Sequence, residues 1–342
     1  MPNRMNVALI GTGMVAGTYV KALADLSDRI AFAGLCARRA ESAEAFRAEH
    51  GLDARVYASV AEIAADPAID FAILATPPDA RLDAVRTLAA AGKPILLEKP
   101  VARSLPEAEE IVALCEAAGV PLGITFQFRC RPAARDLARV IAEGGLGTLH
   151  AVELNVPWWR PQSYYDEPGR GTYARDGGGV LITQAIHALD LMLSFTGPAA
   201  DVIALTATTG MHRMDSEDFV AGGLRFENGA VGALFATTAN APGRTETLTL
   251  NFANATAHLA ASALTIDWLD GRSETIGAVA ASGAGADPMA FTSDWHRDII
   301  ADFADALRDG RPPLVTGREA LNVHRLIAAL ETSGRTGARA AL

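Results

Sequence analysis

MNVALIGTGMVAG, residues 5–17, is an apolar run that breaks into a glycine-rich turn. Met5 to Ile10 predicts a buried strand, and Gly11, Gly13 and Ala16 then follow the order G-x-G-x-x-A of the dinucleotide-binding fingerprint. In that fingerprint the first glycine permits a tight turn, the second lets a pyrophosphate approach the backbone, and the third small residue lets a helix pack closely on the strand. The start of that helix favours phosphate because its N–H groups are unpaired. The expected turn residues are Gly11, Thr12, Gly13, Met14 and Val15.

Composition narrows the class of protein. The 342 residues exceed one ordinary domain, half of them are hydrophobic, and a fifth are charged, which is typical of soluble globular proteins. A net charge of −10, with no basic patch, argues against a nucleic-acid or anionic-membrane partner. Cys36, Cys115 and Cys130 form no C-x-x-C pair, so we expect neither a disulfide framework nor a metal site.

The N-terminus leaves no room for a secretory signal, because the first predicted strand begins within a few residues. No apolar run approaches membrane-spanning length. We therefore expect a cytoplasmic protein with no membrane partner.

Strands and helices alternate from residue 5 to about residue 125, a pattern that predicts a doubly wound parallel sheet covered on both faces. We assign residues 1–125 to a Rossmann domain. The strands are expected at Met5–Ile10, Ile30–Cys36, Arg55–Tyr57, Phe71–Ala75, Ile95–Glu98 and Leu122–Ile124. Ligands of such sheets bind beyond the carboxyl ends of the strands. Further cofactor contacts are therefore expected from Thr76, Pro77, Pro78, Glu98 and Lys99.

The order of predicted strands and helices changes after residue 126. Several strand-like stretches succeed one another without helices between them, joined by turns such as Glu227-Asn228-Gly229, and this predicts an open, mainly antiparallel sheet. We assign residues 126–342 to a second α/β domain. Its last two helices, near 293–308 and 318–334, are expected to pack on that sheet or on the first domain.

Three segments together resemble the Gfo/Idh/MocA family of oxidoreductases, which is named for glucose-fructose oxidoreductase and inositol dehydrogenase. They are GTGMVAG, ATPPDARLDAVRTLAAAGKPILLEKPVA and GGGVLITQAIHALDLML, and the tripeptide E-K-P with the pattern G-G-G…H-x-x-D is their most specific part. The resemblance implies reversible oxidation of a sugar or polyol hydroxyl by NAD(P). It also implies a homo-oligomer, a dimer or tetramer, formed through the second domain's open sheet.

Lys99 is the first candidate catalytic residue. It follows a predicted buried strand directly, between Glu98 and Pro100. Partial desolvation lowers the pKa of a lysine and lets it exchange hydrogen bonds at neutral pH. The alternative is a surface lysine in a turn; the E-K-P resemblance favours the catalytic interpretation.

His187 is the second candidate, on a helix that follows three glycines. Thr183 precedes it by four residues and Asp190 follows by three, so helical spacing predicts one shared face. The resemblance implies that Lys99 orients the substrate oxygen and His187 exchanges its proton, although a core histidine is the alternative. Thr183 is the third catalytic candidate, at a position where family members commonly carry aspartate or asparagine. Asp176 and Gln184 are the alternative sources of the carboxylate or amide that Thr183 lacks.

Aromatic residues are concentrated between Trp158 and Tyr173, in a chain with only 6% aromatics. Aromatic faces beside polar side chains suit sugar rings, and similar stretches occur in family members that act on sugars and sugar nucleotides. A packing loop at a domain or subunit boundary is the alternative. The substrate candidates are Gln127, Arg129, Trp158, Arg160, Tyr165, Arg170, Thr183 and His187.

The end of the second strand bears on cofactor choice. NAD-selective sites usually carry an acidic residue there, but this chain has Ala37, followed by Arg38 and Arg39. Guanidinium groups pair well with a 2′-phosphate, so we expect NADP to be preferred, with NAD as the alternative.

Two other functions are compatible with the fold. Some relatives keep the nucleotide site and act as regulators or sensors without turnover, and others use bound NAD transiently to hydrolyse a glycosidic bond. The presence of both Lys99 and His187 favours a dehydrogenase or reductase.

Overall fold

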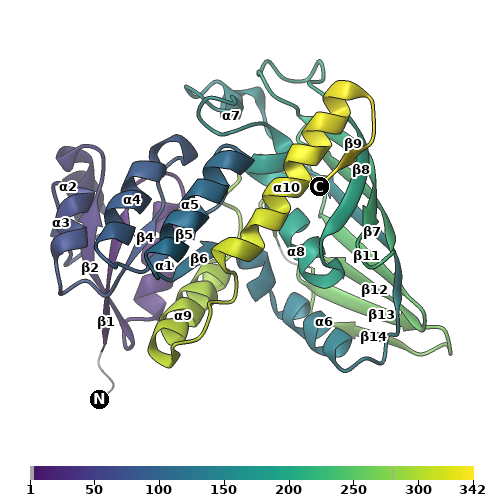
Figure 1. Ribbon diagram of the computed structural model, residues 1–342, viewed down its shortest axis with the longest axis horizontal. Helices are drawn as coiled ribbons and strands as arrows, with labels where there is room; N and C mark the ends of the chain where they lie inside the picture. The colour runs from purple at the N-terminus through teal and green to yellow at the C-terminus, as the bar shows by residue number, and fades with distance from the viewer. Residues whose placement is uncertain (1–3, 280) are drawn as a thin grey trace. The chain divides into compact units, whose positions relative to one another are not determined.

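The computed structural model describes residues 4–279 and 281–342. It divides the chain into two compact units (Figure 1). Met1–Gln127 and Ser293–Leu321 form the first, and Phe128–Thr292 and Asn322–Leu342 form the second. The first unit therefore includes a segment from near the C-terminus of the chain.

A six-stranded sheet, parallel throughout, forms the centre of the first unit, in the order β3-β2-β1-β4-β5-β6. Its strands are β1 (Met5–Ile10), β2 (Ile30–Cys36), β3 (Arg55–Val56), β4 (Phe71–Leu74), β5 (Ile95–Glu98) and β6 (Leu122–Thr125). The helices that follow these strands are α1 (Ala16–Asp25), α2 (Ala40–Glu49), α3 (Val60–Ala65), η1 (Pro78–Ala80), α4 (Leu82–Ala90), α5 (Leu105–Ala117) and η2 (Gln127–Cys130). The strand order reverses between β1 and β4, and doubly wound sheets bind ligands at such a point.

Helix α9 (Asp294–Asp309) belongs to this first unit although it lies far along the chain. Its Phe303 is buried and meets Phe71 of β4 edge to face, with 5.5 Å between ring centroids. A Cβ on Gly123 of β6 would lie 2.6 Å from the Phe303 ring, so only glycine leaves room for it. Burial of a phenylalanine of this kind contributes about 3–5 kcal/mol relative to alanine.

The second unit is built on a nine-stranded sheet in the order β14-β13-β12-β11-β7-β10-β9-β8-β15. Its pairs are antiparallel except β7 with β10, which run parallel. The strands are β7 (Leu149–Pro157), β8 (Ala199–Ala207), β9 (Phe219–Phe226), β10 (Val231–Thr237), β11 (Thr247–Phe252), β12 (Ala255–Ala260), β13 (Ala263–Trp268), β14 (Ser273–Ile276) and β15 (Ala340–Ala341). The remaining helices are α6 (Pro132–Ala142), α7 (Gln162–Tyr165), η3 (Leu181–Ala185), α8 (Ile186–Thr196) and α10 (Gly317–Thr336).

The two faces of this second sheet differ. Figure 1 shows α8 and the C-terminal part of α10 along one face, and there Leu330 approaches Gly222 of β9. On the other face, Ile203 and Leu205 of β8 and Val231 of β10 are more than half exposed, at 55%, 62% and 53%. The expected fold class, a Rossmann sheet plus an open and mainly antiparallel sheet, is confirmed.

The structure adds detail that residue patterns did not predict. The helix that carries His187 begins as a π-helix, η3, before it becomes α8. Between β4 and β5 the helical segment is interrupted at Arg81, which separates η1 from α4. No helix within residues 4–279 and 281–342 has both the length and the apolar character needed to cross a membrane.

Candidate active site

The glycine-rich turn lies at the point where the strand order reverses. Gly11 has φ of +110°, and a Cβ there would lie 2.7 Å from the carbonyl oxygen of Ala75, after β4. Its N–H donates to the carbonyl of Cys36 at 2.8 Å. A Cβ at Gly13 would meet no protein atom within 4 Å, so the space above this turn is open to a pyrophosphate. Thr12, Met14 and Val15 complete the turn before α1 begins.

Arg81, which the residue patterns did not single out, joins the ends of two strands. Its Nε and Nη2 donate to the carbonyl oxygen of Thr76 at 3.0 and 2.8 Å, and Nη2 also donates to that of Lys99 at 3.3 Å. Burial lowers the pKa of Arg81 to about 10, against the opposing charge of Glu98, so the guanidinium remains charged at neutral pH. Arg81 therefore positions both the Thr76-Pro77-Pro78 turn and Lys99.

Glu98 is fully enclosed within the first unit. The hydroxyl of Tyr19 donates to it at 3.0 Å, and Nε2 of His296 lies 3.5 Å from the same oxygen. Burial alone would raise the pKa of this carboxyl, but His296, Lys99 and Arg81 outweigh it and the pKa is lowered. These partners anchor the Glu98 carboxylate at the end of β5, and a contact of Glu98 with the cofactor stays a prediction. Lys99 follows it at that edge, half-buried.

Glu217 determines where the second unit's functional helix begins. Its two carboxylate oxygens accept from the N–H groups of Gly179 and Leu181 at 3.2 and 3.0 Å. A Cβ on Gly179 would lie 1.8 Å from the carbonyl oxygen of Glu217, so any side chain at this position would be excluded. Glycine at position 179 is thus required by a close approach of two main chains.

Thr183 lies in the π-helix that follows. Its hydroxyl donates to the carbonyl oxygen of Gly179 at 2.5 Å and also contacts Oε1 of Gln184. Nε2 of Gln184 donates to the hydroxyl of Tyr164 at 3.4 Å, and Nη1 of Arg170 donates to that same hydroxyl at 3.0 Å. Thr183 is therefore linked through Gln184 to the loop that carries Arg170. Asp176, the other suggested replacement, accepts from the N–H of Gly171 at 3.0 Å.

His187 and Asp190 have different surroundings on α8. The His187 ring stacks on Phe128, with 5.0 Å between centroids and 27° between planes. Asp190 forms a two-bond ion pair with Arg129, from Nε at 2.8 Å and Nη2 at 2.7 Å. Arg129 and Asp190 therefore bind each other within the second unit, and a contact of Arg129 with substrate stays a prediction.

Three substrate candidates from the aromatic loop, residues 158–173, face the interior of the second unit. Trp158 is buried, and its Nε1 donates to Glu246 at 3.1 Å. Arg160 is 3% exposed and donates to the carbonyl oxygens of Trp159 and Gly285 at 2.8 and 2.5 Å. Tyr165 bonds Thr238 at 2.7 Å between hydroxyls. The burial of these three residues favours the alternative of a packing loop, because a face that stacks on a sugar must be accessible, and their contact with substrate stays a prediction.

Other candidates keep positions compatible with binding. Arg170 and the unpredicted Tyr164 are half-buried. Oε1 of Gln127 is buried with no hydrogen-bond partner in the described part of the chain. Ala37 directly follows β2, Arg38 is exposed, and Arg39 donates to Ser42 at 3.2 Å. Within the described residues, no cluster of three or more histidine, cysteine or acidic side chains could hold a metal ion.

Comparison with known proteins shows which protein family the chain matches. The model of the oxidoreductase family with an NAD-binding Rossmann fold matches residues 5–126, and that of the GFO/IDH/MocA C-terminal domain matches residues 134–258. The 1,5-anhydro-D-fructose reductase of Ensifer adhaerens is 34% identical over 56% of this chain and 57% of its own length. The D-apiose dehydrogenase of Paraburkholderia graminis is 29% identical over 98% of this chain and 88% of its own length.

A solved structure extends the similarity to the whole fold. The WlbA dehydrogenase from Bordetella pertussis, in complex with NADH and UDP-GlcNAcA, has a TM-score of 0.86 and 28% identity over 100% of this chain and 98% of its own. Fold and turn together define an oxidoreductase with an NAD(P)-binding Rossmann unit and a second α/β unit. The chain belongs to the Gfo/Idh/MocA family, which confirms the resemblance stated from its sequence.

The buried Glu331 carboxyl on α10 makes the stability of the second unit depend on pH. Its Oε1 is buried without a hydrogen-bond partner among the described residues. Burial, and then the charge of Glu217, raise its pKa from 4.5 to about 7, although Arg335 opposes the change. The folded state therefore binds a proton that the unfolded state loses near pH 4.5.

We predict that this group's contribution to stability is fully present below pH 4.5 and is lost as the pH rises through about 7. Glu331→Gln removes that contribution, so its melting temperature should fall less between pH 5 and pH 8 than that of the unmodified protein. Exposed Glu274→Gln is the matched control and should follow the unmodified curve. Parallel melting curves for Glu331→Gln and the unmodified protein would contradict the assignment.

Proposed function

We propose that this chain is an NAD(P)-dependent dehydrogenase or reductase that transfers hydride between nicotinamide and a hydroxyl or carbonyl carbon of a sugar, polyol or sugar derivative. One observation carries the proposal: Lys99 stands at the same carboxyl edge as the fingerprint turn, joined to the Thr76 turn through Arg81. The names of the relatives, a reductase and a dehydrogenase of sugars, support that substrate class.

The first unit fits the cofactor that this chemistry needs. Gly11 to Val15 and Thr76 to Pro78 would hold it, since the turn has open space above Gly13. The buried Oγ1 of Thr76 has no hydrogen-bond partner in the described part of the chain, which fits a ligand hydroxyl. When bound, the nicotinamide would supply the hydride acceptor or donor.

The chain's own residues would manage the proton. The ammonium of Lys99 would donate a hydrogen bond to the reacting oxygen and so orient and polarise it. The imidazole of His187 would accept the hydroxyl proton during oxidation and return it during reduction, because histidine side chains generally exchange protons near neutral pH. Tyr164, Arg170 and Gln127 would bind the remaining polar groups of the sugar.

The substrate assay separates this function from its alternatives. Incubation with NAD or NADP and a panel of aldoses, inositols, anhydro-sugars and nucleotide-linked sugars should produce absorbance at 340 nm with at least one of them. A regulator would bind nucleotide without producing reduced cofactor. A glycosidase would release sugar from glycosides without net reduction.

Removal of either proton-handling side chain should stop turnover. We predict that Lys99→Ala and His187→Ala each lower kcat by roughly 10²–10⁴, the usual effect of losing a positioned proton-transfer group. Nucleotide affinity should survive in both. Exposed Lys21→Ala and His150→Ala are the matched controls. Near-normal turnover in a Lys99 or His187 variant would remove that residue from the mechanism.

Cofactor preference depends on the end of β2. We propose that NADP is preferred, because Ala37 carries no charge to repel a 2′-phosphate and exposed Arg38 can pair with it. The NADH bound to the WlbA dehydrogenase keeps NAD as the alternative.

We predict that Arg38→Ala weakens NADP binding by about tenfold or more, as expected for a lost charged hydrogen bond. Ala37→Asp should reverse the preference, because its carboxylate would accept from the ribose hydroxyls and repel the phosphate. Arg47→Ala, on exposed α2, is the control. Tighter binding of NAD than NADP by the unmodified protein, in paired Kd titrations, would refute the preference.

The exposed apolar face of the second sheet supports a homo-oligomer. We propose that a second copy covers Ile203, Leu205 and Val231, because apolar side chains this exposed on one face of a sheet, on strands β8 and β10 either side of β9, are unusual for a lone chain. Sedimentation should therefore give a dimer or tetramer, and Leu205→Asp should dissociate it, whereas exposed Glu153→Asp, a control, should not. A monomer at micromolar concentration would exclude this interface.

A further inference from the structure

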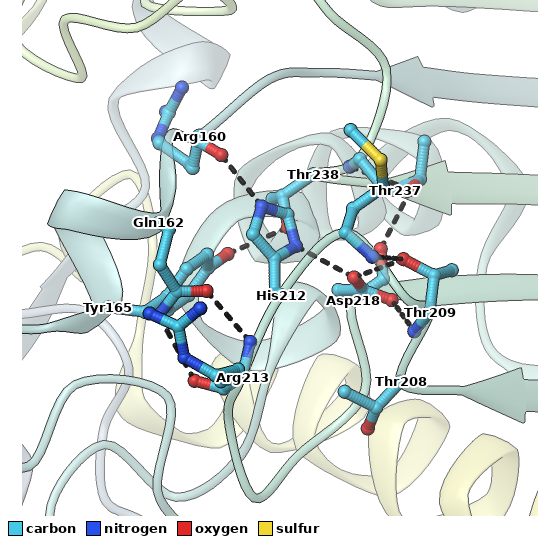
Figure 2. Close-up of polar contacts among 12 residues, drawn as sticks. Arg160, Gln162, Tyr165, Thr208, Thr209, His212, Arg213, Asp218, Thr237 and Thr238 are labelled. Atoms are coloured by element: carbon cyan, nitrogen blue, oxygen red, sulfur yellow. Dashed lines mark hydrogen bonds and ion pairs between the residues drawn. The ribbon is translucent and has the colours of Figure 1, made fainter.

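His212 is a buried histidine that the proposed mechanism does not use. It lies in the 208–218 loop between β8 and β9, and its side chain and that of Asp218 are both 0% exposed. Figure 2 shows the ring between two acceptors. Nδ1 lies 2.7 Å from Oδ2 of Asp218, and Nε2 lies 2.7 Å from the carbonyl oxygen of Arg160.

This geometry determines the number of protons on the ring. A carbonyl oxygen only accepts, so Nε2 must donate to Arg160. Asp218 accepts from the N–H and the hydroxyl of Thr209, each at 2.7 Å, as well as from His212. Several donors favour the ionised form of a carboxyl group, which then can only accept. Nδ1 must therefore donate too, and a ring that donates from both nitrogens is an imidazolium.

The surroundings of the ring contain one countercharge and two aromatic faces. Asp218 is the ionised group in contact with it. Trp159 and Tyr165 pack against it with centroids at 5.7 and 4.8 Å, and the Tyr165 hydroxyl is directed to Thr238. The guanidinium of Arg160 binds the carbonyl oxygens of Trp159 and Gly285.

Several contacts from the 208–218 loop converge on the aromatic loop. Beside His212, Gln162 exchanges two hydrogen bonds with the main chain of Arg213, at 3.2 and 2.7 Å. The Asp218 carbonyl accepts from the N–H of Thr238 at 2.9 Å, and Thr238 in turn bonds Tyr165. The segment from Arg160 to Tyr165 is thus held at both ends (Figure 2), and Tyr164 belongs to this segment by its place in the chain.

We propose that His212 is a positioning residue for substrate: as an imidazolium paired with Asp218, it fixes the loop that presents Tyr164 and Arg170. The role in substrate binding rests on the proposed function. The protonation state of the ring does not, so the two are tested separately.

The first experiment reads the protonation of the intact protein. The chain has 7 histidines, and selective ¹⁵N labelling with a His212→Asn spectrum for assignment isolates the His212 signals. At pH 7.5 both ring nitrogens of His212 should show shifts and attached protons typical of imidazolium. One unprotonated His212 nitrogen at that pH would overturn the ion pair.

The second experiment reads substrate binding. His212→Asn should raise KM for the sugar by about tenfold or more, the effect expected from a lost charged hydrogen bond, with kcat changed less than about threefold. The Kd for NADP, bound by the first unit, should stay the same. His150→Asn is the control, and His212→Gln, which keeps one donor toward Arg160, replaces His212→Asn if that variant does not fold.

The outcomes distinguish the two hypotheses. If the unmodified protein shows no turnover of any sugar, the proposed function fails while the ¹⁵N result still decides the charge. If it is active and KM is unchanged in the folded His212 variant, His212 does not position the substrate loop. A parallel loss of NADP affinity would point to general damage and would also overturn the assignment.

Discussion

Two close approaches of main chain to main chain, each possible only at a glycine, determine where the functional helices begin. Gly11 brings the fingerprint turn against Ala75, and Gly179 brings the start of the π-helix against Glu217. A Cβ at either position would lie well within contact distance of a backbone oxygen, which cannot move aside. The nucleotide turn precedes α1 and the proposed proton-exchanging histidine follows on α8, so both groups depend on this constraint.

Buried charges then hold the backbone in place around these starting points. Arg81 holds two strand-end carbonyls, Glu217 accepts from two helix N–H groups, and the Arg129–Asp190 pair joins η2 to α8. Removing one partner of a buried pair costs about 3–5 kcal/mol, because the other charge is left uncompensated. These buried charged side chains therefore stabilise the backbone around the site. They differ in this from side chains that are available to contact a ligand.

This distinction separates the site candidates that have partners inside the protein from those whose positions suit a ligand. Glu98, Arg129, Trp158, Arg160 and Tyr165 are of residue types suited to ligands, and each has partners inside its own unit. Lys99, His187, Thr183, Gln127 and Arg170 remain candidates for contact with cofactor or substrate. Thr183 stands where family members commonly carry a carboxylate or an amide. Its hydroxyl is directed to the Gly179 carbonyl and to Gln184.

The sequence by itself determined the fold class, the nucleotide turn and the family, because these depend on local patterns: alternating strand and helix, glycines at set spacing, and contiguous motifs. It could not determine which polar side chains are enclosed, because their partners are distant in the chain. Asp190 is 61 residues from Arg129, and Glu217 is 38 from Gly179. Only the tertiary structure brought His212 between Asp218 and the Arg160 carbonyl, since the charge of that ring follows from two acceptors supplied by separate loops.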